Sequence, residues 1–464
     1  MFALDLRSLA LMRVAVGAVV LIDVLVRMAH LSAHYSDQGV LSRADAAALD
    51  PLARVSLLAL HGSPEWAGLV FVLAVGCSLA VIAGWRTRLV TALLWLCVVS
   101  IQHRNPWLGD HRDALINCML VWGMLLPWGR VLSVDARRDG GISTRYVGVA
   151  GVGYVLQIGC LYLFAAILKS GPEWRSEYTA VYYALSVDYW TLPPARALLA
   201  HPWLTRALTV STVWFEAAVA ALLLIPWRVA GFRTVVVTGV IGMQIGFGVC
   251  IWLGTFPLIS SAAMLGLLPA TFWTLPGVRR IARWGIARSQ DAGAPEAAEP
   301  VGDGRVPGVV AALVTGSLLL LNVLSASPGV KPDAHPVLSA AALLGFSQNW
   351  DMFAPSPSRI DGSFVAEGRS ASGDIVDLSP RFRTTRELVY FRRLLRADKR
   401  ALQGYATYQC RSSKLSSPLA SVTLHFLREY IPPPGVPAPA VEKQVVIEHA
   451  CPYASEQVPG ARER

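Results

Sequence analysis

Long apolar runs separated by short polar segments dominate the chain up to about residue 325. A helix of roughly 20 apolar residues crosses a hydrocarbon core of about 30 Å, so each such run predicts a membrane span. Nine spans are predicted, of which the third and fourth are short: Ser8–Ala29, Trp66–Gly84, Leu89–Gln102, Asp113–Pro127, Val147–Lys169, Leu204–Pro226, Val235–Gly254, Phe256–Leu275 and Val309–Ser325.

The pattern changes beyond residue 326, where the apolar runs become short. Val422, Leu424 and Phe426 alternate with polar neighbours, which is typical of a half-buried strand. An aromatic, turn-rich segment at Asn349–Pro357 precedes the predicted elements. Strands are predicted near Ser363–Ala366, Asp374–Leu378, Ser421–Leu427 and Gln444–Glu448, and a helix over Thr384–Gln403. The tail from Val458 is predicted to be disordered.

The two patterns together predict an all-α polytopic membrane bundle of about nine transmembrane helices with a small α+β extracytoplasmic C-terminal domain. Residues 1–288 hold the first eight spans, and residues 308–326 form the ninth. Residues 289–307 are rich in Ala, Gly, Pro and acidic residues, which predicts a flexible cytoplasmic linker. Residues 327–464 form the C-terminal domain with its disordered tail.

Composition and charge support a membrane protein and assign its orientation. Hydrophobic residues make up 54% of the chain and charged residues 16%, while the net charge is +10. With a cytoplasmic N-terminus, the inside segments hold fourteen arginines and the outside segments six, as the positive-inside rule requires. We therefore predict a bacterial inner-membrane protein with its C-terminal domain outside. The basic charge is explained by these loops, so the lipid bilayer is expected as a partner and nucleic acid is not.

The cysteines indicate no metal site, because no CxxC or Cys/His spacing is present. Cys410 and Cys451 lie in the polar C-terminal region, which is expected to be oxidising. They are either joined in a disulfide or remain two free thiols. The other five lie in apolar runs and are interpreted as core residues: Cys77, Cys97, Cys118, Cys160 and Cys250.

Several ionisable residues lie within the predicted spans, where charge is costly and usually faces the bundle interior. Asp23 and Arg27 are four residues apart and are interpreted as a structural pair on one helix face. Arg13 and Glu216 are interpreted as a second structural pair that joins two helices. The functional alternative for these two residues is a proton path.

Lys169 ends the fifth span and is the only lysine in the first 330 residues. The structural alternative is a snorkelling lysine, whose stem lies in lipid and whose amine reaches the headgroups. Tyr162, however, lies on nearly the same helix face, and Ala165 and Ala166 leave space beside the amine. Partial desolvation favours a neutral amine, which can act as a general base.

A second polar cluster lies between the third and fourth predicted spans, on the same side as Lys169. Arg104, Asn105, Asp110 and Asp113 offer acids, bases and amide donors within a short segment. They are a second candidate for the site. The structural alternative is a polar turn in which Asp113 caps the fourth helix. Gln244, within the seventh span, is expected to hydrogen-bond to a neighbouring helix.

Six stretches in order along the chain carry a family resemblance: Leu6–Arg13, Tyr35–Leu41, Arg104–Pro106, Tyr162–Trp174, Gly254–Pro257 and Asn349–Pro355. They resemble the bacterial HTTM proteins, which are relatives of the vitamin K-dependent gamma-carboxylase. This resemblance implies a bundle of nine helices with an outward-facing site.

The carboxylase resemblance is narrower and rests on Lys169 followed by Glu173 and Trp174. It implies that Lys169 is the base that deprotonates reduced vitamin K or menaquinol, for carboxylation of an envelope protein or for quinol oxygenation. The C-terminal domain is shorter than the lumenal portion of the carboxylase. Gln244 stands where the bacterial relatives are expected to carry a histidine.

Two other functions are considered beside this enzyme. The chain could be a non-enzymatic membrane protein whose outer domain binds an envelope partner, or a transporter, although no internal repeat or pair of broken helices marks a transport site. For the enzyme, Lys169→Ala is expected to abolish turnover and to leave the melting temperature nearly unchanged.

Overall fold

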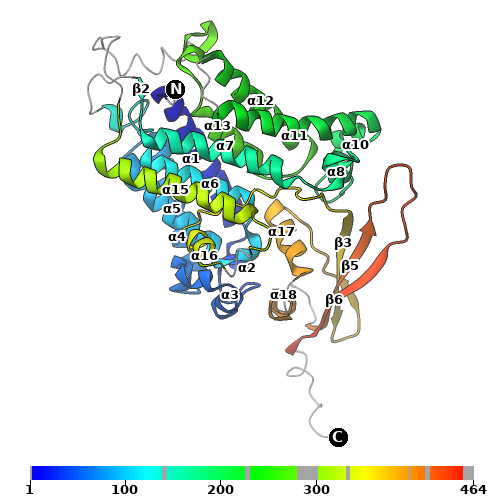
Figure 1. Cartoon of the computed structure of the whole chain (residues 1–464). Coiled ribbons are helices and arrows are strands. Elements are labelled where there is room, and N and C mark those ends of the chain that lie inside the picture. The colour runs from blue at the N-terminus through cyan, green and yellow to red at the C-terminus, as the bar shows by residue number, and fades with distance from the viewer. Residues whose placement is uncertain are drawn as a thin grey trace.

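The computed structural model describes residues 3–137, 144–224, 230–278, 301–330, 335–396, 399–412 and 418–452. These residues are mostly helical, with a small antiparallel sheet in the C-terminal part (Figure 1). Six helices are long and apolar enough to cross a membrane: α1 (Leu6–Met28), α4 (Pro64–Ala83), α7 (Val149–Leu168), α11 (Pro202–Leu224), α12 (Ala230–Cys250) and α15 (Arg305–Ala326).

The three other predicted spans are also helical, but each is shorter or less apolar than the six helices named above. The third is α5 (Thr87–Arg104), which has 18 residues but carries polar side chains near both ends. The fourth is α6 (His111–Leu125), with only 15 residues. The eighth is divided into α13 (Phe256–Leu265) and a short 3-10 turn at Ala270–Thr274. Helix α13 ends before Pro269, which cannot continue an α-helix.

Local sequence signals explain where the helices begin and end. At the start of α4, Ser63 Oγ accepts a hydrogen bond from the Trp66 backbone N–H, and proline occupies the first helical position. Gly84 ends the same helix with φ +72°, a conformation that favours glycine. At the start of α6, Asp110 and Asp113 form a capping box.

The bundle is closed by pairs of helices from distant parts of the chain. Helix α1 packs against α4 and α13, and α7 packs against α11 and α15. Five short helices connect the spans: α2 (Leu31–Tyr35), α3 (Arg43–Leu49), α8 (Pro172–Arg175), α9 (Ala180–Leu185) and α10 (Pro193–Leu199).

The end of the predicted linker is anchored to the bundle. Strand β1 (Leu4–Asp5) pairs with β2 (Arg145–Tyr146), and Val301 forms a bridge to Tyr146. Asp303 accepts hydrogen bonds from the Tyr146 hydroxyl and from the N-terminus of α7. Helix α15 starts at Arg305, four residues before the predicted span Val309–Ser325, and residues 289–300 of the linker lie outside the described residues.

The C-terminal sheet is antiparallel with strand order β4-β3-β5-β6. It contains β3 (Ile360–Ser370), β4 (Ile375–Asp377), β5 (Leu419–Tyr430) and β6 (Glu442–Ala450). The four predicted strands are therefore confirmed, although three of them are longer than predicted.

The single helix predicted over Thr384–Gln403 is wrong, because the structure has α17 (Thr385–Leu394) and α18 (Lys399–Ser412). These helices lie between the sheet and the bundle (Figure 1). Short helix α16 (Pro336–Leu343) precedes the sheet. The tail from Val458 lies outside the described residues.

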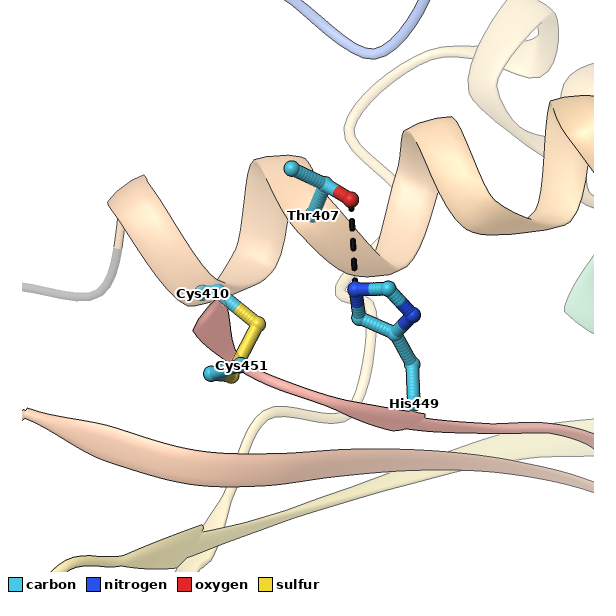
Figure 2. The surroundings of a disulfide bond; sticks show 4 residues. All are labelled: Thr407, Cys410, His449 and Cys451. Atoms are coloured by element: carbon cyan, nitrogen blue, oxygen red, sulfur yellow. Dashed lines mark hydrogen bonds between the residues drawn. A yellow bond between two sulfur atoms is a disulfide. The ribbon is translucent and has the colours of Figure 1, made fainter. Parts of the chain in front are cut away.

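A disulfide joins Cys410, near the end of α18, to Cys451, directly after β6 (Figure 2). The structure thus adopts the first of the two alternatives for these cysteines. A hydrogen bond of 3.2 Å between Thr407 Oγ1 and His449 Nε2 joins the same helix and strand. Together these contacts hold α18 on the sheet.

Reduction of this disulfide is expected to destabilise the C-terminal domain by about 2–4 kcal/mol, because the bond closes a long loop and limits the unfolded chain. Proteolysis of the full chain with and without dithiothreitol measures this effect. The variant Cys410→Ser/Cys451→Ser is the control and should be as sensitive without reductant as the reduced wild type. Equal resistance of all samples would contradict the prediction.

Candidate functional site

A cavity of about 600 Å³ lies between α7, α11, α12 and α13. Its walls are mainly aliphatic and aromatic, and the loop around Phe353 covers part of it. Lys169 and Glu216 are the charged residues among those that line it. Ligand sites are usually concave and apolar with a few convergent polar groups, and this cavity has that character.

Lys169 and Glu216 form a buried ion pair in the cavity wall. Lys169 Nζ lies 3.0 Å from Glu216 Oε1 and 2.8 Å from Oε2. The two residues are only 3% and 5% exposed. The amine also donates to the Ala165 carbonyl at 3.2 Å and lies 5.4 Å from the centre of the Trp174 ring. A snorkelling lysine would extend away from the bundle, so this amine is held inward instead.

The end of α7 places this amine. The helix stops at Leu168, because Gly171 and Pro172 follow and do not continue it. The Arg175 side chain then donates to the carbonyls of Ala166 and Lys169, both at 2.7 Å, where α7 has no further helical donors. The backbone of Lys169 is therefore fixed at the helix end.

The predicted pair between Arg13 and Glu216 is wrong. The Arg13 guanidinium donates to the carbonyls of Val81 and Ile82 at 2.9 and 3.1 Å, at the end of α4. It also donates to the Leu132 carbonyl at 2.5 Å. Because α11 packs against α7 and α1 packs against α4, Glu216 faces Lys169 and not Arg13.

Tyr162 and Gln244 also line the cavity. The Tyr162 hydroxyl lies 3.1 Å from Ser260 Oγ and also interacts with the Gln244 side chain. Gln244 is 2% exposed, and its Oε1 has no hydrogen-bond partner among the described residues. A buried carbonyl without a donor is costly, so this oxygen is a candidate acceptor for a ligand hydroxyl.

Glu173 does not line the cavity. Its carboxylate accepts hydrogen bonds from Ser356 Oγ at 2.5 Å and from the Arg359 guanidinium, whose Nη2 is 2.7 Å away. Burial alone would raise the pKa of Glu173, but the hydrogen bonds from Ser356 and Arg359 lower it. Glu173 therefore acts as an anchor for the loop at Asn349–Pro357.

The sequence indicates a turn-rich aromatic segment here, which is also one of the six stretches that carry the family resemblance, but it assigns the segment no place in the site. The structure places Met352 and Phe353 in the cavity wall. The Trp174 indole donates to the Phe353 carbonyl at 2.9 Å, and the Gly171 N–H donates to the Pro355 carbonyl at 2.9 Å. The residues that follow α7 thus fasten the loop over the cavity.

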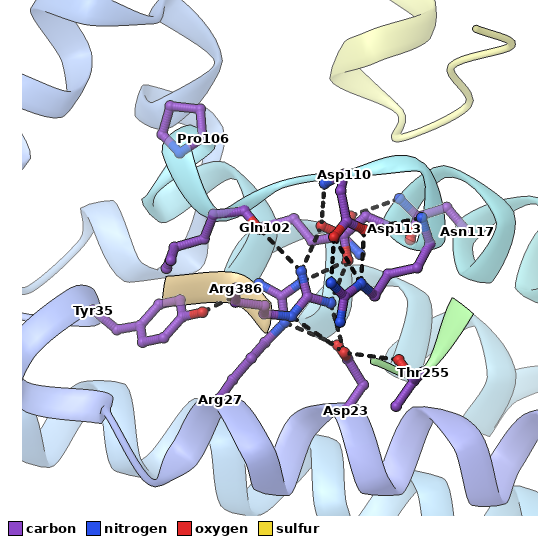
Figure 3. Close-up of polar contacts among 12 residues, drawn as sticks. Asp23, Arg27, Tyr35, Gln102, Pro106, Asp110, Asp113, Asn117, Thr255 and Arg386 are labelled. Atoms are coloured by element: carbon purple, nitrogen blue, oxygen red, sulfur yellow. Dashed lines mark hydrogen bonds and ion pairs between the residues drawn. The ribbon is translucent and has the colours of Figure 1, made fainter. Parts of the chain in front are cut away.

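The polar cluster around Asp113 lies apart from the cavity and forms an ion network (Figure 3). Asp23 accepts from Arg27 Nε at 2.9 Å, as the sequence spacing predicts. Arg27 also lies 2.5 Å from Asp113. Arg386 of α17 enters the same network and contacts Asp23 at 2.5 Å and Asp113 at 2.8 Å. Sequence reasoning missed Arg386, because it is one of many arginines in a basic helix.

The remaining candidates of this cluster make structural contacts. Arg104 donates to the Leu41 carbonyl at 2.8 Å, and Asn105 donates to the His34 carbonyl at 3.3 Å. Burial would raise the pKa of Asp110, but Arg112 and Arg386 lower it to about 2. The four residues of the predicted second cluster thus hold loops and cap α6, and none of them lines the cavity.

The fold and site define a polytopic helical membrane protein with a buried lysine–glutamate pair in a largely apolar cavity. The family model of the HTTM domain matches residues 3–270, more than half of the chain. The chain therefore belongs to the HTTM family, membrane proteins related to the gamma-carboxylase. No curated protein and no solved structure matches it.

Proposed function

We propose that the cavity binds a quinol, of the reduced vitamin K or menaquinol class, and that Lys169 and Glu216 exchange a proton with one of its hydroxyls. The observation that carries this proposal is the buried ion pair in an otherwise apolar cavity of about 600 Å³. A quinol has the matching chemistry, because it joins two hydroxyls on a flat ring to an apolar chain.

The cavity has groups that fit both ends of such a ring. The ion pair of Lys169 and Glu216 can exchange a proton with one hydroxyl of the ring. The Gln244 Oε1 atom, which has no partner among the described residues, can accept a hydrogen bond from the other hydroxyl. Gly242 and Gly246 line the cavity from α12 and leave open space, since an added Cβ would meet nothing within 4 Å. This open side faces away from the bundle core and suits an apolar chain that extends into lipid.

The ion pair can accept a proton in either of its arrangements. With an ammonium and a carboxylate, Glu216 is the basic member, while with an amine and a carboxylic acid it is Lys169. In both arrangements the second member stays hydrogen-bonded to the first and stabilises the change in charge. The base is thus the pair and not Lys169 alone. A bound quinol would supply the oxidisable ring for oxygenation, as in the related carboxylase.

The proposal includes nine membrane crossings in a bacterial inner membrane, with the C-terminal domain outside. Helices α5, α6 and α13 occupy the positions of the three less apolar spans. The arginine distribution supports a cytoplasmic N-terminus. The disulfide between Cys410 and Cys451 supports an oxidising compartment for the domain. An envelope protein is the substrate that this placement favours.

Gly242→Leu tests the cavity directly. The larger side chain fills space on the open side, so affinity for reduced vitamin K is expected to fall at least about tenfold, as a loss of roughly 1.4 kcal/mol implies. Binding to the purified protein is followed by quenching of tryptophan fluorescence. Gly231→Leu is the matched control, because Gly231 is on the same helix, has open space, and does not line the cavity.

Two outcomes decide against the proposal. If the wild type neither binds nor oxidises the quinol, the non-enzymatic alternative is favoured, and crosslinking from the C-terminal domain should then recover an envelope protein. If Gly242→Leu binds as tightly as the wild type while Gly231→Leu also binds, the quinol occupies a different place.

A further inference from the structure

A second cavity lies at the opposite end of the bundle from Lys169. It has a volume of about 410 Å³ and lies between the start of α5 and the segment that follows α6. Helix α5 runs from this cavity to Arg104. Helix α6 runs back toward the cavity from Asp113, which belongs to the ion network of Asp23, Arg27 and Arg386. Figure 1 shows the N-terminus and β2 at the end of the bundle away from the C-terminal sheet. The second cavity therefore belongs to a separate site.

Three arginines and one carboxylate line this cavity: Arg86, Arg88, Arg130 and Asp135. Asp135 accepts hydrogen bonds from the backbone N–H groups of Arg86 and Thr87, both at 2.8 Å, and from Thr87 Oγ1 at 2.6 Å. This carboxylate thereby caps the N-terminus of α5. Among the described residues that line the cavity, the guanidinium groups of Arg86 and Arg88 carry more positive charge than the carboxylate of Asp135 balances.

The cavity opens beside a surface that suits lipid chains. Leu89 lines it and is exposed, and Leu93 and Leu96 continue the same exposed face along α5. Trp85 is also exposed, and the Arg86 guanidinium lies 5.5 Å from the centre of its ring. Exposed tryptophan beside arginine is typical of the boundary between lipid chains and headgroups.

One residue of the cavity wall carries a buried donor without a partner among the described residues. Trp128 lines the cavity and is fully buried, and its Nε1–H has no hydrogen-bond partner among the described residues. Arginine guanidinium groups bind phosphate oxygens through paired N–H donors. The cavity thus combines positive charge with an adjacent apolar surface formed by Leu89, Leu93 and Leu96, and one buried donor of its wall has no partner among the described residues.

We propose that this cavity is a phosphate-binding site, and that its ligand is the headgroup phosphate of an anionic phospholipid. The exposed leucines favour a lipid over a soluble phosphate, because they offer a surface for acyl chains next to the charge. Arg86 and Arg88 hold the phosphate, and Leu89 marks the direction in which the chains leave. The site is independent of the quinol proposed for the other cavity.

Native mass spectrometry of the purified full chain tests this site, with equal amounts of phosphatidylglycerol and phosphatidylcholine added to the detergent. The wild type is expected to retain phosphatidylglycerol with a preference of about tenfold, and Arg86→Asn/Arg88→Gln should reduce the preference to about one. Asparagine is chosen because Arg86 has φ +43°, which asparagine tolerates well. Arg196→Gln/Arg206→Gln removes the same charge elsewhere and should keep the preference.

A second pair of measurements separates the sources of the phosphate. Arg86→Lys/Arg88→Lys keeps the charge and should keep most of the preference, which also shows that the region tolerates substitution. If the wild type prefers neither lipid, but inorganic phosphate raises its melting temperature and not that of Arg86→Asn/Arg88→Gln, the ligand is a soluble phosphate. If the wild type and that variant behave alike in both assays, the proposed site is wrong.

Discussion

Lys169→Met is expected to lower the free energy of unfolding by about 3–5 kcal/mol and to reduce quinol turnover by about 10²- to 10⁴-fold. The substitution leaves Glu216 buried without its partner, since Lys169 Nζ is the cation within 3.0 Å of both carboxylate oxygens. This differs from the expectation drawn from sequence, in which loss of Lys169 leaves the melting temperature nearly unchanged. Denaturant unfolding in detergent and oxygen uptake with reduced vitamin K measure the two effects.

The double variant Lys169→Met/Glu216→Leu separates the structural role of the pair from its chemical role. Replacement of both members by apolar side chains removes the unpaired charge, so stability should return to near that of the wild type. Turnover should remain lost, because no amine or carboxylate is then left among the described residues that line the cavity. Turnover that survives in this stable variant would contradict the proposed base. Failure of the double substitution to restore stability would contradict the structural account of the pair.

Arg386→Met is expected to release α17 from the bundle. Arg386 is buried and binds Asp23 and Asp113 from two different helices, and it also donates to the Leu108 carbonyl at 3.1 Å. Its loss leaves two buried carboxylates that share Arg27, at a cost of about 3–5 kcal/mol. Amide hydrogen exchange in α17 should therefore accelerate by about 10²- to 10⁴-fold.

The control for this prediction lies on the same helix. Arg393 is exposed and donates to the Pro106 carbonyl, so Arg393→Met should change exchange by less than about tenfold. Arg386→Lys keeps the charge but loses the planar arrangement of donors, and an intermediate effect is expected. If Arg386→Met exchanges like Arg393→Met, the buried network does not hold the domain on the bundle.

Two sets of polar contacts join the C-terminal region to the membrane bundle. Arg386 enters the network of Asp23, Arg27 and Asp113, while Glu173 holds Ser356 and Arg359 beside the cavity. The second connection places Phe353 over the proposed quinol site. The sequence predicts a separate domain outside the membrane bundle, and the structure shows that the start of this region also forms part of the cavity wall.

Much of the secondary structure is evident from the order of residues alone. Apolar length predicts α1, α4, α7, α11, α12 and α15, and period-2 alternation predicts the strands, because both patterns depend on neighbours along one segment. The position of Lys169 at the end of α7 follows from Gly171 and Pro172 in the same way. The division of the basic C-terminal helix into α17 and α18 was missed, because its periodicity continues across the break.

Partners across the bundle could not be inferred from the sequence. Glu216 has the same local surroundings whether it faces Arg13 or Lys169, and the packing of α11 on α7 selects Lys169. Arg386 reaches Asp23 over a separation of 363 residues, which no local pattern indicates. Hydropathy and periodicity depend on residues close in the chain, whereas a buried charge is stabilised by whichever opposite charge the assembled helices bring within a few ångströms.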